Sequence, residues 1–205
     1  RNVTGVQTCA LPILSEHMAG ALKRKLPPAV VEKTKLHILD TFGAIVSGAR
    51  LEPGVLAIRY VKGLGGKAEA GVVGSRLKAT AQDAAFAGGC AAHADETDDT
   101  HPSSHIHPGA PIVPAALAAA EKVHASGRAL LRAVTLGYDV GTRSTKALDV
   151  PGFMETERSI HSFGGTFGAG AAAGALHRLN ALQMRHLLSF CAQSVAGCGI
   201  YMHDI

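Results

Sequence analysis

The stretch VEKTKLHILDTFGAIV, residues 31–46, decides the fold class. Its apolar residues recur on one face at the 3.6-residue period of a helix: Val31, Ile38, Phe42 and Ile45, widened by Leu39 and Val46. The charged Lys33 and Asp40 lie off that face. Pro27 and Pro28 precede it, and proline is tolerated in the first turn of a helix because its missing N–H has no partner there. The pattern predicts an amphipathic helix.

Helical patterning extends along nearly the whole chain. Thr80 and Asn180 are predicted N-caps, because their side-chain oxygens can accept hydrogen bonds from the free N–H groups of a first turn. The one strand-like piece, residues 70–74, is too short to found a sheet. The sequence therefore predicts an all-α fold, with further helices over 15–25, 53–61, 81–92, 111–125, 128–146, 167–179 and 181 to about 196.

Composition supports closely packed helices and argues against two classes of partner. Of 205 residues 47% are hydrophobic, and small side chains dominate, with 24 Gly and 35 Ala. Only 18% of residues are charged, the net charge is +4, and no dense Lys/Arg stripe is present, which argues against nucleic-acid binding. No run of about 18 apolar residues occurs, so no membrane span is expected.

The cysteines and the two ends add expectations about compartment and boundaries. Cys9, Cys90, Cys191 and Cys198 form no CxxC pair and are expected to be buried free thiols of a reducing, cytoplasmic environment. Residues 1–13, RNVTGVQTCALPI, show neither helical period nor strand alternation and are expected to be a non-native leader. Residues 14–205 are expected to be one helical domain that is incomplete at its C-terminus.

The stretch HADETDDTHPSSHIHPG, residues 93–109, holds four acidic residues and four histidines where a helix runs into a loop. Loops on rigid scaffolds often carry functional sites. In one interpretation a loop histidine moves protons while Glu96 or Asp99 orients it, because imidazole titrates near neutral pH. In another, the acids cap helices and the histidines are merely solvated. A third interpretation is a divalent metal site, with ligands His93, Asp98, Asp99 and His101 or His107.

A second candidate feature is His161, which is expected just before a Gly/Ala-rich helix. The free N–H groups and positive dipole of a helix N-terminus suit a carboxylate substrate. The glycines from Gly168 to Gly174 superficially resemble a dinucleotide-binding fingerprint, but no strand precedes them and no acidic ribose partner follows. Helix packing explains them better.

Four stretches together carry a family resemblance. LHILDTFG at 36–43, the 93–109 stretch, His161 with its Gly/Ala helix and QMRHLLSFCAQ at 183–193 occur in this order. Over about residues 15–205 the chain resembles the family of 2-methylcitrate dehydratase and cis-aconitate decarboxylase, the MmgE/PrpD family. The resemblance implies an all-helical domain, with the family's smaller α+β domain missing from this chain.

Carried over residue by residue, the resemblance implies His107 and His161 as the catalytic pair. It implies Glu96, Thr100 and Asp99 as residues that bind substrate or orient the imidazole. The loop before His107 is about one residue longer than in the decarboxylase pattern, so His105 is a rival to His107, and Arg158 is a candidate partner for a substrate carboxylate.

The implied activity is dehydration of a small polycarboxylate such as 2-methylcitrate, or its decarboxylation or isomerisation, by histidine acid–base catalysis. The resemblance implies no metal and no organic cofactor, and a homodimer for the full-length protein. The chain alone is expected to be inactive, since the family's catalytic lysine would lie beyond Ile205. A metal-dependent lyase or hydrolase using the 93–107 cluster and a non-catalytic helical interaction protein remain the alternatives.

Overall fold

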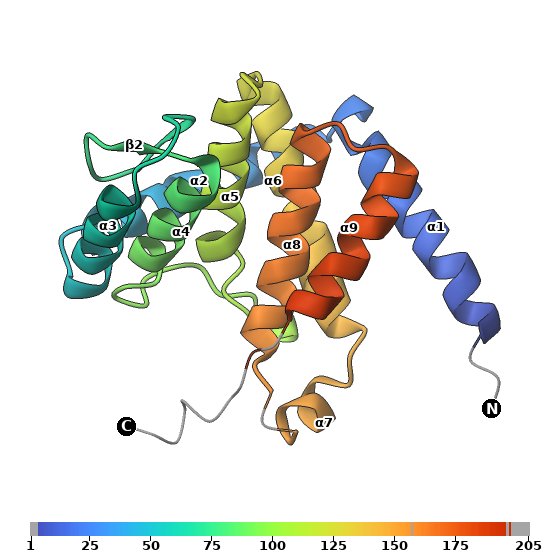
Figure 1. The fold of residues 1–205 in the computed structure, drawn as a ribbon. Coiled ribbons are helices and arrows are strands. Elements are labelled where there is room, and N and C mark those ends of the chain that lie inside the picture. The colour runs from blue at the N-terminus through green and yellow to red at the C-terminus, as the bar shows by residue number, and fades with distance from the viewer. Residues whose placement is uncertain (1–3, 157, 196, 198–205) are drawn as a thin grey trace.

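The computed structural model describes residues 4–156, 158–195 and 197, and it confirms the predicted all-α class (Figure 1). Apart from one short hairpin, the regular elements described are helices. In chain order they are α1 (Thr4–Gly20), η1 (Ala21–Lys23), α2 (Pro28–Gly48), α3 (Glu52–Leu64), β1 (Ala70–Gly71), β2 (Lys78–Ala79), α4 (Ala81–Ala92), η2 (Pro102–Ser104), α5 (Gly109–Lys122), α6 (Gly127–Lys146), α7 (Val150–Met154), α8 (Ile160–Leu176) and α9 (Ala181–Ser194).

Helices α5, α6 and α8 form the centre of the fold. Figure 1 shows α2, α3 and α4 on one side of this group and α9 and α1 on the other. The core between the central helices is built from Ile112, Val134, Ala172 and Leu176, each at most 3% exposed. The two strands pair antiparallel, with Ala70 opposite Ala79, and lie against α4 and α5. The hairpin therefore covers one edge of the helical array and founds no sheet of its own.

Glycines let α6 and α8 approach each other closely. A Cβ on Gly141 would lie 2.7 Å from the carbonyl oxygen of Gly164, and a Cβ on Gly137 would lie 2.9 Å from that of Gly168. Only the absence of a side chain permits backbone-to-backbone contact at these points. The small-residue packing expected from composition is thus the feature that fixes α8 in the fold.

The predicted caps are confirmed. The Thr80 side chain accepts a hydrogen bond from the Asp83 N–H at the start of α4. At the start of α9, Asn180 and Gln183 form a reciprocal capping box, in which each side chain accepts a hydrogen bond from the other residue's backbone N–H.

Several expected boundaries are wrong. Helix α8 begins at Ile160, with Ser159 as its N-cap, and not near Phe167. Helix α1 includes residues 4–13, for which no helical pattern was expected, and is followed by a short 3-10 turn. The assignment of residues 1–13 to a non-native leader stays a prediction. Leu39 and Val46, expected to widen the buried face of α2, are 68% and 50% exposed, whereas Ile45 is fully buried.

Two cysteines lie within the part of the chain whose side chains are described. Cys90 and Cys191 are free thiols, and burial raises the pKa of both, which makes them weak nucleophiles. Cys198 and the side chain of Cys9 lie outside that description. Among the described helices, none has the length and apolar character that crossing a membrane requires.

Candidate active site

The loop between α4 and α5 carries most of the candidate residues. Residues 93–108 leave the end of α4, form the 3-10 turn η2, and return at Ile106, whose carbonyl oxygen accepts a hydrogen bond from the His101 N–H at 2.9 Å. Glu96 and His105 have φ angles of 54° and 51°, in the left-handed region that non-glycine residues rarely adopt. The loop is therefore a defined structure with strained turns.

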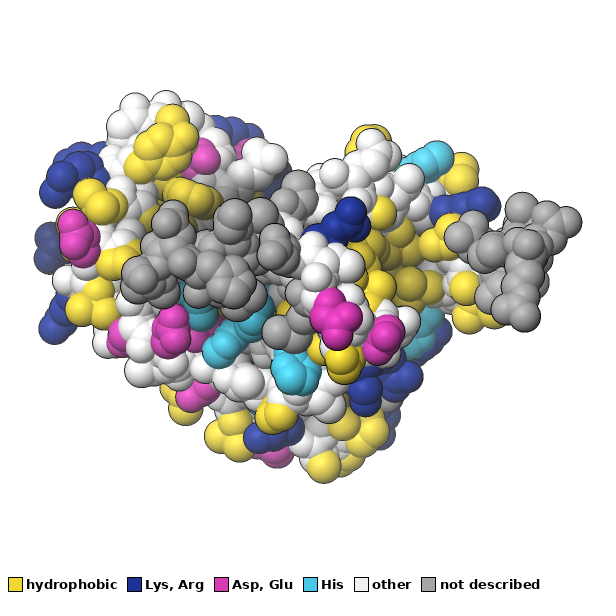
Figure 2. Space-filling view, turned by 90° about the horizontal axis from the view of Figure 1, so that it is seen from below, with side chains coloured by type: hydrophobic (Ala, Val, Ile, Leu, Met, Phe, Trp, Pro, Cys, Tyr) yellow, Lys and Arg dark blue, Asp and Glu magenta, His cyan; other side chains and the backbone are white. Residues whose placement is uncertain are grey.

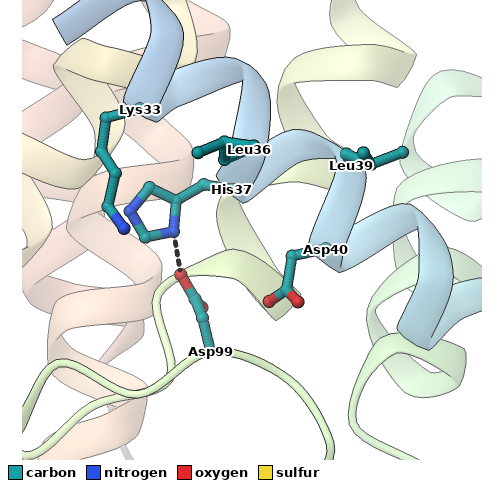
Figure 3. A pocket seen from close by; sticks show the side chains of 6 residues that line it. All are labelled: Lys33, Leu36, His37, Leu39, Asp40 and Asp99. Atoms are coloured by element: carbon teal, nitrogen blue, oxygen red, sulfur yellow. Dashed lines mark ion pairs between the residues drawn. The ribbon is translucent and has the colours of Figure 1, made fainter. Parts of the chain in front are cut away.

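Asp99 anchors this loop to the helices behind it. Its carboxylate accepts hydrogen bonds from the Gly109 N–H at 2.7 Å and from the Tyr138 hydroxyl at 2.8 Å, and it lies 2.9 Å from Nδ1 of His37. Figure 3 shows the His37 contact, with Lys33 of α2 nearby. Burial by itself raises the pKa of Asp99, but the hydrogen bonds from His37, Tyr138 and Gly109 outweigh it, so the pKa is lowered.

Gly109 is part of the same anchor. A Cβ at this position would lie 2.6 Å from both the Asp99 carboxylate and the Thr41 hydroxyl. The glycine therefore lets the N-terminus of α5 reach Asp99. Burial raises the pKa of Tyr138, and the Asp99 charge raises it further, so Tyr138 acts as a hydrogen-bond donor and not as an acid.

The neighbouring Asp98 points to the other side of the loop, toward two histidines. Its side chain is fully buried, and its carboxylate oxygens lie 3.0 and 3.2 Å from Nδ1 of His93. One of them also lies 3.7 Å from Nδ1 of His107. The Thr100 hydroxyl lies 3.3 Å from the same His107 nitrogen. A buried carboxylate and a hydroxyl thus fix the orientation of the His107 ring.

His161 completes a row of three imidazoles. It lies in the first turn of α8, and its ring stacks on that of His107 with centroids 5.3 Å apart and planes inclined by 24°. The His93 and His107 centroids are 5.2 Å apart. Residues from both ends of the loop between α4 and α5 and from the start of α8 therefore meet at one end of the bundle. Figure 2, which views the molecule from that end, shows histidine side chains gathered beside acidic ones.

The surroundings of His161 favour its neutral form. Burial lowers the pKa of His161, and nearby His107 and His93 lower it further, because positively charged imidazoles repel. The Asp98 charge opposes these effects without cancelling them. A neutral imidazole near pH 7 can accept a proton.

A cavity of about 560 Å³ opens beside these histidines. Two helix N-termini border it, since Ser159 and Ser162 belong to the start of α8, and Ala110 and Pro111 to the start of α5. Free N–H groups and the positive dipole at such ends suit a carboxylate. Its lining consists of Gly89, His93, Glu96, His107, Ala110, Pro111, Ser159, His161 and Ser162.

The structure brings together most, but not all, of the candidates from the sequence. Glu96, His107 and His161 line the cavity, and Thr100 contacts His107. Asp99 lines a different hollow beside α2 and has its carboxylate occupied by the anchor contacts.

Two further candidates lie away from the cavity. His105, the rival to His107, is exposed and absent from the lining, and so is Arg158.

Asp98 was considered from the sequence as a metal ligand and not as the partner of His107. The adjacent acidic residues Asp98 and Asp99 indicated that a carboxylate could orient a histidine. Only the conformation of the loop decides which of the two faces the histidines and which faces Tyr138.

Part of the proposed metal-ligand set also comes together. One ligand atom each from His93, Asp98 and His107 lies within 4.8 Å of the other two. Asp99 contacts His37 and Tyr138 instead, and His101 contacts the Ser104 hydroxyl. Of the ligands suggested from the sequence, His93, Asp98 and His107 therefore lie together, whereas Asp99 and the alternative His101 do not.

Comparisons with known proteins agree on the family. The sequence model of the MmgE/PrpD N-terminal domain matches residues 13–204. Human cis-aconitate decarboxylase is 33% identical over 184 residues, which cover 84% of this chain and 36% of that protein. The cis-aconitate decarboxylase-like protein oryM of Aspergillus oryzae is 28% identical over 161 residues, covering 75% of this chain and 33% of that protein. The chain spans about a third of the length of these relatives.

Proposed function

This chain belongs to the MmgE/PrpD family, and we propose that it supplies the acid–base half of a lyase site for small polycarboxylates. The observation that carries the proposal is the stacked pair His107 and His161 in the lining of a cavity that two helix N-termini border. The reaction is loss of water from a hydroxylated polycarboxylate, or loss of CO2 from an unsaturated one. The names of the relatives favour the decarboxylation.

Both reactions pass through negative charge on a carbon next to a carboxylate. In dehydration, a base takes the proton from that carbon and an acid protonates the leaving hydroxyl group. In decarboxylation, the bond to CO2 breaks and an acid protonates the carbon that keeps the electron pair. Positioned imidazoles supply such proton transfers near neutral pH.

The different partners of the two rings support a division of roles. Nδ1 of His107 lies 3.7 Å from the Asp98 carboxylate and 3.3 Å from the Thr100 hydroxyl, which leaves Nε2 to deliver a proton to the substrate, so His107 is the proposed acid. His161 has no carboxylate among its described hydrogen-bond or ion-pair partners and is the proposed base. Thr100 holds the His107 ring, and Glu96 borders the space for substrate.

Substrate carboxylates would lie at the start of α8, beside Ser159 and Ser162. Backbone N–H groups at this end can donate hydrogen bonds to an anion without a full positive charge nearby. Such donors also stabilise the negative charge that develops during the reaction.

The test measures the turnover of citrate-like and cis-aconitate-like acids by the full-length protein that contains this chain. Loss of water and release of CO2 are followed separately. His107→Ala and His161→Ala should each reduce kcat by roughly 10²–10⁴-fold, the usual contribution of a positioned acid or base. His186→Ala, an exposed histidine on α9, is the matched control and should retain full activity. Unchanged turnover in both site variants would refute the proposal.

A further inference from the structure

We propose that His93, Asp98 and His107 form a binding site for Zn²⁺, or for a similar divalent transition metal, and that its occupation inhibits the active site. The binding part stands on the geometry of the three side chains alone. The inhibition part rests on the proposed function, because it depends on His107 being the acid. The sequence resemblance implies a reaction without a metal, so an ion at this place would regulate the site and not serve the chemistry.

The donor set matches what zinc binds in open sites. Two imidazole nitrogens, which are borderline ligands, together with one carboxylate oxygen suit Zn²⁺ better than Mg²⁺ or Ca²⁺, which prefer oxygen ligands throughout. Three protein ligands leave the fourth tetrahedral position to water. That position would face the cavity, since both histidines line it.

The distances are close to those a tetrahedral ion needs. Bonds of about 2.0–2.1 Å place neighbouring ligand atoms about 3.3 Å apart. An Asp98 oxygen lies 3.0 Å from Nδ1 of His93 and 3.7 Å from Nδ1 of His107, on either side of this value. The His93 and His107 side chains are 49% and 26% exposed, so they can adjust around the buried carboxylate.

Binding must replace the hydrogen bond between His93 and Asp98. Nδ1 of His93 lies 3.0 Å from an Asp98 oxygen in the metal-free site. The ion takes the electron pair of that nitrogen and the charge of the carboxylate, and a neutral His93 imidazole keeps its one proton on Nε2.

Occupation would stop the proposed acid from working. An imidazole with a metal ion on one nitrogen retains the proton on the other near neutral pH, so His107 could no longer deliver it. The added positive charge would also disfavour protonation of His161, whose ring stacks on that of His107.

The first experiment measures binding without substrate, because polycarboxylates chelate Zn²⁺ themselves. The chain is titrated with ZnCl₂ by calorimetry, and with Co²⁺ as a spectroscopic probe. We expect one ion per chain. Asp98→Asn and His93→Ala should each weaken binding at least tenfold, and His186→Ala should not. His93 is half exposed, so its variant keeps the test valid if Asp98→Asn fails to fold.

Absence of binding, or equal affinity in wild type, His93→Ala and a folded Asp98→Asn variant, would overturn the site. Inhibition is then measured in the longest protein that contains this chain, at buffered free Zn²⁺, as the ratio of activities with and without metal. Zn²⁺ should lower wild-type turnover more than tenfold, and His93→Ala should shift the inhibiting concentration upward by the same factor as its affinity.

The outcomes separate the two proposals. Zinc binding in a protein that turns over no polycarboxylate would refute the proposed function and leave the binding site standing. Loss of activity in a chelator, restored by Zn²⁺, would overturn inhibition and favour the metal-dependent alternative.

Discussion

The substitution Gly141→Ala tests the packing that fixes α8. The new Cβ would lie 2.7 Å from the carbonyl oxygen of Gly164 and 3.3 Å from the Cα of Gly168. Both are backbone atoms on α8, which no side-chain rotation can move away. The two helices must therefore separate by several tenths of an ångström, and α8 carries His161.

Two opposing effects set the magnitude. Replacing glycine by alanine inside a helix gains about 0.5–1 kcal/mol of intrinsic propensity. Overpacking a filled interior costs about 1–3 kcal/mol, and contact with backbone places this case in the upper part of that range. The net destabilisation should be about 1–2 kcal/mol, which lowers the Tm of a chain of this size by roughly 2–8 °C.

Gly43→Ala on α2 is the matched control, because no atom lies within 4 Å of its added Cβ. Gly43→Ala should gain the higher helix propensity of alanine without any cost of overpacking, and so raise the Tm by about 1–4 °C. Thermal and urea denaturation of both variants, followed by circular dichroism, measures the difference. If Gly141→Ala is as stable as Gly43→Ala, the close contact between α6 and α8 does not constrain the fold as argued.

Three smaller predictions concern single contacts. Tyr138→Phe removes a hydrogen bond to Asp99, so it should raise the pKa of Asp99 and lower the free energy of urea unfolding at pH 7 by about 1–2 kcal/mol. Because folding lowers the pKa of Asp99, the wild type loses stability as the pH falls through the folded-state pKa of this carboxyl group. The variant should lose less stability than the wild type over that acid range. Asn180→Ala should cost about 1 kcal/mol in the same assay. NMR titration should place the pKa of His161 below that of a free imidazole, about 6.5, and should show a higher pKa for His161 in His107→Ala. Since the unfolded chain protonates this imidazole more readily than the folded chain does, the free energy of unfolding should fall as the pH drops below about 6.5.

The sequence predicted the helices that have strong local signals and misplaced the start of α8, which depends on packing. Thr80 and Asn180 could be recognised as N-caps from the sequence, because a cap is a contact between residues close in the chain. The first turns of α8 contain Gly164 and Gly165, whose low helix propensity hid the true start. Contact with α6 stabilises these turns, and no local pattern encodes that contact.

The candidate site shows the same limit. The family resemblance was sufficient to select His107 and His161, whose rings the structure stacks on each other. It could not separate the roles of Asp98 and Asp99, because adjacent carboxylates differ only in which way the folded loop turns them. Asp98 faces the histidines, and Asp99 faces Tyr138.

In the proposed function, His107 and His161 transfer protons to and from a carbon next to a carboxylate. The direct measurement is the rate at which deuterium from D2O enters that carbon of a citrate-like or cis-aconitate-like acid, followed by NMR in the longest protein that contains this chain. We expect incorporation in the wild type and a rate at least roughly 10²-fold lower in His107→Ala and in His161→Ala. Incorporation at the wild-type rate in both variants would show that these histidines do not transfer the proton.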